Sequence, residues 1–334
     1  MLSTEHREEG EMLLEEAEQV RRNAVGDEVH LRGIVEFSNI CTQHCLYCGL
    51  RGDNCRLTRY RMTPSEIVEA AQRAKDWGCK TVVLQSGEDP WFTRDRMLDL
   101  IGWIKERAEV AITLSVGERT YGDYRAWKAA GADRYLLKHE TASPGLYESL
   151  RPGHKLADRM KALSWLQDLG YEVGSGNIVG LPGQTDDDLA ADVELFCQKN
   201  FDMIGIGPFI AHPQTPLAGT PNGQLTKTLK VLALTRILTR DTNLPATTAT
   251  GVLEPDGQRK ALLAGGNVIM PDVTPAVYRK HYEIYPGKGE IPGTPRAVID
   301  MIASLGRRIS QGTGSRSSPS ARSPELRGME KAPS

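Results

Sequence analysis

The stretch CTQHCLYCGLRGDN, residues 41–54, places three cysteines within eight positions, directly after the apolar run GIVEFSNI of residues 33–40. Its C-x3-C-x2-C spacing allows one loop to offer three thiolates to a single metal centre. A 4Fe-4S cluster normally takes four cysteine ligands, so a cluster held by Cys41, Cys45 and Cys48 alone would keep one iron open for a substrate or cosubstrate. The alternatives are a structural zinc site that adds His44 as a fourth ligand, and three thiols that bind no metal.

Short apolar or β-branched runs alternate with helical patterns on both sides of this loop. The strands expected from these runs span residues 33–39, 81–87, 111–117, 134–140, 172–180, 202–210, 245–253 and 266–273. Eight strand and helix units with no break in composition up to about residue 308 predict one α/β domain, a (β/α)8 TIM-type barrel. A doubly wound sheet with an appended domain is the alternative. In the barrel, the three-cysteine loop follows the first strand and lies at the C-terminal end of the strands, where barrel active sites gather.

The two ends of the chain differ in composition from this barrel, which is expected over residues 33–310. Residues 4–22 form an acidic amphipathic pattern, which predicts a helix within an N-terminal lead-in of residues 1–32. From Gln311 the chain is rich in Ser, Pro, Gly and Arg, so residues 311–334 are predicted to be a disordered tail.

Two of the barrel helices carry start signals. Thr63 and Glu66 have the spacing of a capping box, and Pro64 stands at the first helical position. Thr185 and Asp188 repeat that spacing ahead of an acidic first turn. We therefore expect helices to begin directly after Thr63 and Thr185.

Composition and charge exclude several classes of partner. The formal net charge of -2 supplies no basic field for nucleic acid, and no apolar segment approaches the roughly 18 to 20 residues that span a bilayer. The acidic N-terminus lacks the pattern of a signal peptide, so we expect a cytoplasmic protein. Its six cysteines should then stay reduced and act as metal ligands, nucleophiles or core residues, while Cys55 is a loop thiol with no evident role.

The three cysteines, with Tyr47 before the third, resemble the signature of the radical S-adenosylmethionine (SAM) superfamily. In that superfamily the amino and carboxylate groups of SAM chelate the open iron, and an injected electron cleaves the sulfonium to give a 5'-deoxyadenosyl radical. The resemblance implies that Cys41, Cys45 and Cys48 hold a 4Fe-4S cluster with an open iron. It also implies that SAM is the second cofactor and that the protein is an enzyme.

Other segments resemble the SAM-binding motifs of the same superfamily. QSGED, residues 85–89, resembles the motif that binds the methionyl amino group, and GNIVGLPGQT, residues 176–185, resembles the segment beside the adenine. A carboxylate after the fourth strand suits the ribose hydroxyls, and an arginine suits the SAM carboxylate. Without the resemblance, QSGED is interpreted as an ordinary turn, and Glu140 and Arg159 are interpreted as solvated surface charges. The SAM-binding residues implied are Tyr47, Ser86, Gly87, Glu88, Ser115, Glu140, Arg159 and Ile178.

Within the superfamily, the chain resembles the HydE family of FeFe-hydrogenase maturases over about residues 33–287. The matching segments include VEFSNICTQHCLYCGLRGDN, DRYLLKHETA, FDMIGIGPFIAHP and GNVIMP. Some members carry three more cysteines near the C-terminus for a second cluster. The corresponding region here has none, so no second cluster is expected.

The resemblance also implies a reaction and partners. HydE helps to form the bridging dithiomethylamine ligand of the hydrogenase active site from an iron–cysteine complex supplied by HydG. HydG and HydF are thus the expected protein partners, with a reductant such as ferredoxin or flavodoxin. A mutase similar to methylornithine synthase and a non-catalytic metal-binding barrel are the other hypotheses.

Polar or soft side chains at strand ends are expected to line the substrate side of the cavity. An anionic iron complex suits a cation there, and threonine hydroxyls suit a carboxylate or cyanide. Core packing is the alternative for the methionines. The expected substrate residues are Gln85, Thr113, Arg134, Lys138, Met203, Thr247, Thr248, Met270 and Tyr282.

Overall fold

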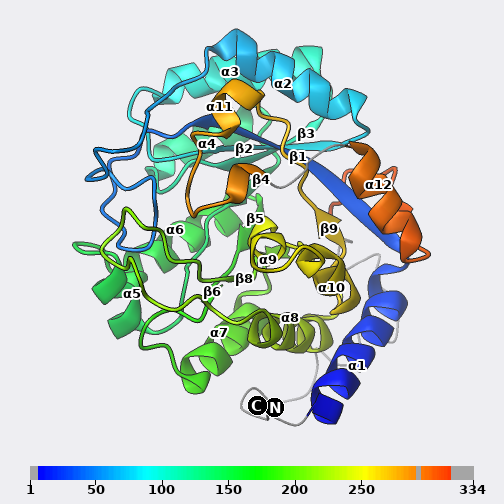
Figure 1. Ribbon diagram of the computed structural model, residues 1–334. Helices are drawn as coiled ribbons and strands as arrows, with labels where there is room; N and C mark the ends of the chain where they lie inside the picture. Colours follow the sequence, from blue (N-terminus) through cyan, green and yellow to red (C-terminus); the bar gives the residue numbers. More distant parts are fainter. Residues whose placement is uncertain (1–6, 291–294, 317–334) are drawn as a thin grey trace.

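A computed structural model describes residues 7–290 and 295–316. Short strands at the centre are surrounded by an outer layer of helices (Figure 1). The strands are β1 (Glu28–Ser38), β2 (Thr81–Ser86), β3 (Ala111–Ser115), β4 (Arg134–Leu136), β5 (Glu172–Ser175), β6 (Ile178–Val179), β7 (Met203–Ile204), β8 (Gly207–Pro208), β9 (Val268–Ile269) and β10 (Arg308–Ile309). The helices are α1 (Arg7–Val25), α2 (Pro64–Asp76), α3 (Arg94–Arg107), α4 (Tyr121–Ala129), α5 (Pro144–Leu150), α6 (Leu156–Asp168), α7 (Asp186–Lys199), α8 (Leu225–Thr239), α9 (Thr248–Leu253), α10 (Gly257–Leu263), α11 (Ala276–Arg279), α12 (Pro295–Ser304) and the 3-10 turn η1 (Lys288–Glu290).

The main sheet is parallel and follows the order of the chain. Its strands lie in the order β1-β2-β3-β4-β5-β7, and β9 and β10 both pair with β1. A doubly wound sheet reverses its strand order at a switch point, and this sheet does not, so the alternative fold is wrong. The fold is a parallel half-barrel covered by helices, and the C-terminal ends of its strands all face one side.

Isolated bridges continue the ring beyond β7. Met203 pairs with Asn243 and Pro245 pairs with Val268, each as a single parallel bridge. The amide of His30 in β1 accordingly donates to the carbonyl of Asn267, at 2.9 Å. The predicted eight-unit barrel is confirmed in part, because the half-barrel and its helices are present while the last units are not regular strands.

Three of the predicted strands are interrupted or replaced in the structure, and two more, 134–140 and 266–273, are shortened to β4 and β9. Residues 172–180 form two short strands, β5 and β6, and residues 202–210 form β7 and β8. Close approach of the two backbones at Gly176 accounts for the interruption, since a Cβ there would lie 2.1 Å from the carbonyl oxygen of Gly205. The predicted strand 245–253 is wrong, because α9 occupies most of it and tertiary packing overrides the β propensity of its threonines.

The helix starts follow the sequence signals. Thr63 caps α2 and Thr185 caps α7, each in a reciprocal capping box with the residue at the third helical position, as predicted. The N-terminal helix spans Arg7–Val25. Because β1 already begins at Glu28, the first strand extends into the region expected as a lead-in.

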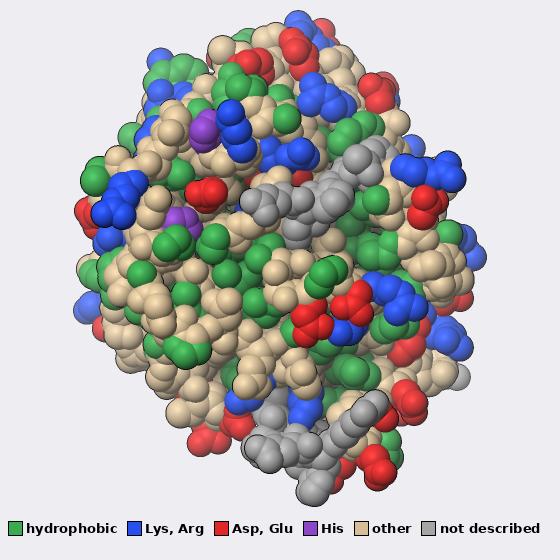
Figure 2. Space-filling view, viewed as in Figure 1, with side chains coloured by type: hydrophobic (Ala, Val, Ile, Leu, Met, Phe, Trp, Pro, Cys, Tyr) green, Lys and Arg blue, Asp and Glu red, His purple; other side chains and the backbone are tan. Residues whose placement is uncertain are grey.

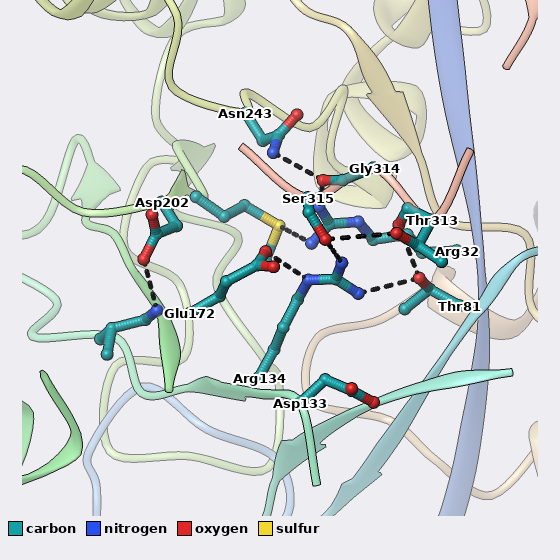
Figure 3. Close-up of polar contacts among 12 residues, drawn as sticks. Arg32, Thr81, Asp133, Arg134, Glu172, Asp202, Asn243, Thr313, Gly314 and Ser315 are labelled. Atoms are coloured by element: carbon teal, nitrogen blue, oxygen red, sulfur yellow. Dashed lines mark hydrogen bonds and ion pairs between the residues drawn. The ribbon is translucent and has the colours of Figure 1, made fainter. Parts of the chain in front are cut away.

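The chain after β10 closes the N-terminal end of the half-barrel (Figure 3). Arg134, the first residue of β4, donates hydrogen bonds to Glu172 at 2.7 Å and to Ser315 at 2.8 Å. Residues 311–316 are therefore packed against the barrel, which corrects the prediction of disorder from Gln311 onward. The remaining part of that predicted tail, residues 317–334, lies outside the described residues.

Charges of both signs are mixed on the face of the molecule that Figure 2 shows, and no large patch of one sign stands out there. This distribution agrees with the net charge of -2 and differs from the basic stripe of a nucleic-acid-binding protein. Within the described ranges, none of the helices has the length and apolar character needed to cross a membrane.

Candidate functional site

The three-cysteine loop follows β1 and is fixed to several strand ends. The thiols of Cys41, Cys45 and Cys48 are free and partly buried. Backbone hydrogen bonds connect the loop to the segment after β2, to the last residue of α5 and to the segment after α11: Thr42 to Glu88 at 3.2 Å, Leu46 to Leu150 at 2.9 Å and Gly49 to Ile284 at 3.0 Å. The loop therefore has a fixed position at the C-terminal side of the barrel.

Burial controls the protonation of these thiols. It raises the pKa of Cys41, Cys45 and Cys48 above the ordinary thiol value. A coordinated metal ion reverses this effect, because it binds the thiolate form outright. Without a bound metal these thiols stay protonated, which makes them poor nucleophiles.

The thiols are not arranged to hold a single ion. In the part of the chain that the structure describes, no three His, Cys, Asp or Glu side chains converge on a point where one metal ion could bind. A 4Fe-4S cluster does not require such convergence, since each of its cysteine ligands binds a different iron.

The turn after β2 packs directly beneath the loop. A Cβ at Gly87 would lie 2.3 Å from the carbonyl oxygen of Ile40 and 2.7 Å from the Cβ of Cys41, so only glycine fits this contact. The carboxylate of Glu88 accepts a hydrogen bond from Gln43 at 2.6 Å and another from the amide of Glu118 at 3.1 Å. Glu88 therefore connects the loop to the segment after β3 through these two hydrogen bonds.

A cavity of about 270 Å³ opens beside the loop. Its lining is mostly apolar, with a few polar groups from the C-terminal ends of the strands, as is usual for a small-molecule site. The expected site residues that line it are Tyr47, Cys48, Gln85, Lys138, Glu140, Ile178, Met203, Thr247, Thr248 and Met270.

Glu140 has unused hydrogen-bonding capacity in this cavity. Its backbone adopts a φ of 68°, which is rare for a residue other than glycine. Its buried Oε2 accepts no hydrogen bond, and the ammonium of Lys138 lies 3.7 Å away. A ligand with hydroxyl donors, such as a ribose, fits this orphaned acceptor.

Arg159 is buried near Glu140 and is largely occupied. It pairs with Glu118 and donates to the carbonyl of Lys138. Burial alone would raise the pKa of Glu118, but the charge and hydrogen bond of Arg159 outweigh it and lower that pKa. Only the remaining N–H groups of Arg159 are free for a SAM carboxylate.

The other expected cofactor residues lie around the cavity but do not line it. Ser86 ends β2, where its hydroxyl donates to the carbonyl of Gly87, and Ser115 ends β3 opposite Gln85. Tyr282, an expected substrate residue, does not line the cavity either: it is buried, and its hydroxyl accepts a hydrogen bond of 3.2 Å from Gln85. The strand-end positions thus converge on one side of the barrel.

Two expected substrate residues lie at the wrong end of the barrel. Arg134 begins β4 and lines, with Thr113, a small second cavity of about 10 Å³ at the N-terminal side. In the run RYLLKHE the side chains near residue 140 reach the C-terminal end, whereas Arg134 at the start cannot. The expectation that Arg134 and Thr113 face the substrate is therefore corrected. Met203 borders both cavities.

Sequence reasoning missed a buried ion pair at the edge of the cavity. Lys288, the first residue of η1, lines the cavity and pairs with the carboxylate of Glu36 on β1. Both side chains are nearly inaccessible, at 5% and 1% exposed. Burial lowers the pKa of Lys288. The run YPGKGE offers no periodic signal for such a residue, so only the tertiary structure reveals it.

Comparison with known proteins agrees with this geometry. The profile of the radical SAM superfamily matches residues 35–196. The [FeFe] hydrogenase maturase subunit HydE of Thermotoga maritima is 52% identical over 319 residues, which cover 94% of this chain and 91% of that protein.

Solved structures agree as well. The crystal structure of the methylornithine synthase PylB has a TM-score of 0.83 and 26% identity, and covers 92% of this chain and 91% of its own. The maturase HydG from Carboxydothermus hydrogenoformans shares the fold alone, with a TM-score of 0.74 at 20% identity, over 92% of this chain and 73% of its own. With its three-cysteine loop beside a cavity at the strand ends, the chain is a radical SAM enzyme and belongs to the family of the hydrogenase maturase HydE.

Proposed function

We propose that this chain acts in the maturation of FeFe hydrogenase, as a HydE-type enzyme that binds one 4Fe-4S cluster and SAM. The observation that carries the proposal is the three-cysteine loop beside the 270 Å³ cavity, in a chain 52% identical to a HydE subunit. A methylornithine synthase activity has less support, since that relative is 26% identical.

In this proposal Cys41, Cys45 and Cys48 hold the cluster and leave its fourth iron to SAM. The three free thiols and the fixed backbone of the loop support this role. When bound, the cluster and SAM supply one electron and a carbon-centred radical. The protein contributes the apolar walls of the cavity, which keep water away from that chemistry.

The SAM contacts are assigned from the unused groups around the cavity. Glu140 accepts hydrogen bonds from the ribose, which its orphaned Oε2 supports. Ile178 packs against the adenine, and Tyr47 lies against the loop side of the cavity. The turn at Ser86 and Gly87 receives the methionyl amino group, and the free N–H groups of Arg159 face the carboxylate.

The substrate is an anionic iron complex bearing cysteine, delivered by HydG, and the product contributes to the bridging dithiomethylamine ligand. The expected contacts of the substrate are the ammonium of Lys138, the hydroxyls of Thr247 and Thr248, and the thioethers of Met203 and Met270, and all five residues line the cavity. HydF and a reductant such as ferredoxin or flavodoxin complete the set of partners. A cytoplasmic location suits the six free cysteines.

Two cysteine variants test the ligand assignment. Cys45→Ala removes one ligand and is expected to abolish SAM cleavage and to lower iron content after anaerobic reconstitution. Cys55→Ala is the matched control, because Cys55 is exposed on the same loop and is expected to keep wild-type iron. Equal loss of iron in both variants would refute the assignment, and full 5'-deoxyadenosine formation by Cys45→Ala would refute the proposed function.

A further inference from the structure

A buried polar network lies directly behind the residues that the proposed function assigns to the adenosine end of SAM. Its members are His139, Asn177 and Asp192, and all three side chains are fully buried. These three residues do not line the 270 Å³ cavity, whereas Glu140 and Ile178, which follow His139 and Asn177 in the sequence, do line it. The network is therefore separate from the SAM contacts but connected to them along the chain.

Glu140 is presented to the cavity by a tight turn with an unfavourable backbone. Its φ of 68° lies in the left-handed region, and the amide of Thr141 donates across it to the carbonyl of His139, at 2.8 Å. Three-residue turns with a positive φ at the middle residue are rare and strained, so they persist only where surrounding contacts hold them. The position of the Glu140 carboxylate thus depends on contacts on either side of this turn.

The carboxylate of Asp192, on α7, supplies such contacts. Its Oδ1 accepts a hydrogen bond from the amide of Ala142, two residues after Glu140. The same oxygen lies 3.4 Å from Nε2 of His139, the residue before Glu140. Its Oδ2 accepts a hydrogen bond of 2.7 Å from Nδ2 of Asn177. One carboxylate thus contacts the chain on both sides of the turn and the segment beside it.

Asn177 connects the turn to the residue proposed to pack against the adenine. Glu140 and Asn177 form a parallel bridge, in which the amide of Glu140 donates to the carbonyl of Gly176 at 3.0 Å. The amide of Ile178 in turn donates to the carbonyl of Glu140 at 2.9 Å. Because Asp192 holds the side chain of Asn177 as well as the turn, α7 fixes both segments relative to each other.

We propose that Asp192 is a positioning residue for the adenosine end of SAM: its carboxylate holds the strained turn so that the carboxylate of Glu140 stays at the cavity. Buried partners behind a binding residue affect affinity although they do not touch the ligand. Each oxygen of Asp192 receives an N–H donor, so an amide in its place would bring its own N–H groups against one of these donors. This inference rests on the proposed contact of Glu140 with the ribose.

The test is the affinity of the anaerobically reconstituted protein for SAM, measured by titration calorimetry. Asp192→Asn is expected to keep wild-type iron content and to weaken SAM binding by roughly tenfold. Val193→Ala is the matched control, because it shortens the next side chain on α7, which is also buried, and leaves the polar contacts in place. This control is expected to lower the free energy of unfolding and to keep wild-type SAM affinity.

A double variant separates positioning from a general loss of structure. Glu140→Ala removes the acceptor through which Asp192 is proposed to act, so adding Asp192→Asn to it should weaken SAM binding much less than Asp192→Asn does alone. Three results would each overturn the inference: a further loss in the double variant as large as in the single variant, wild-type affinity in Asp192→Asn, or an equal loss in Val193→Ala.

If Asp192→Asn does not fold, Asp192→Ala decides, because it removes the carboxylate without adding a donor. Weakened SAM binding by a folded Asp192→Ala protein supports the inference, and wild-type affinity overturns it. Failure of both variants to fold beside a folded Val193→Ala also overturns it, since the carboxylate would then serve the fold alone. Absence of SAM binding by the wild-type protein would instead defeat the proposed function, so the two failures are distinguishable.

Discussion

Replacement of Gly87 by alanine tests how tightly the three-cysteine loop rests on the turn after β2. The new Cβ would lie 2.3 Å from the carbonyl oxygen of Ile40 and 2.7 Å from the Cβ of Cys41. Both distances are below the contact distance of carbon with carbon or oxygen, and both neighbours are rigid. The loop must therefore move away from β2, and overpacking of this kind costs about 1–3 kcal/mol.

The expected result is a lower free energy of unfolding and a lower iron content in the Gly87→Ala protein. Denaturant unfolding measures the first, and iron analysis after anaerobic reconstitution measures the second. Gly102→Ala is the control, because nothing lies within 4 Å of a Cβ at this position in α3 and alanine is the better helix former by about 0.5–1 kcal/mol. If Gly87→Ala reconstituted like wild type and unfolded at the same denaturant concentration, the packing argument would be wrong.

Three further predictions concern charged groups. Lys288→Met leaves the carboxylate of Glu36 buried without a counter-ion, so denaturant unfolding should show a free energy of unfolding lower by about 3–5 kcal/mol. The added change Glu36→Gln should restore part of this stability, and no recovery in the double variant would argue against the pair. Burial lowers the pKa of His30 to about 4, so the unfolded chain takes up the proton first and stability should fall as the pH drops from 6.5 toward 4. In a His30→Gln protein, the unfolding temperature measured at a series of pH values should depend less steeply on pH than in the wild type. An unchanged slope of unfolding temperature against pH would contradict this. Arg134→Gln removes the ion pair with Glu172 at the N-terminal end of the barrel, so the protein should be less stable. Titration calorimetry should still find wild-type SAM affinity, and a weakened affinity would show that Arg134 contributes to the site.

Local patterns were sufficient for the parts of the site that lie within one segment. The cysteine spacing, the capping boxes at Thr63 and Thr185, and the acidic residue after β4 each depend on neighbours in the sequence. The parallel sheet could also be predicted, because apolar runs alternating with helices allow few other arrangements.

The features that sequence reasoning missed depend on contacts between distant segments. The interruption at Gly176 arises from the approach of Gly205, and the pairing of Lys288 with Glu36 joins η1 to the first strand. None of these contacts leaves a periodic signal in the sequence.

The misplacement of Arg134 has a different origin. A strand has two ends, and in a seven-residue run about 20 Å separates them, so residues of one run cannot all reach the same site. Arg134 and Glu140 mark the two ends of such a run, and only Glu140 lines the larger cavity. The direction of the strand is therefore enough to exclude Arg134 from the site.

The most direct test of the account is electron paramagnetic resonance of the anaerobically reconstituted and reduced protein, with and without SAM. Cys41, Cys45 and Cys48 as the only ligands predict one 4Fe-4S signal, which shifts when SAM binds to the open iron. A signal that SAM leaves unchanged, or tightly bound zinc in place of iron, would contradict the proposal that these three cysteines form an open catalytic site.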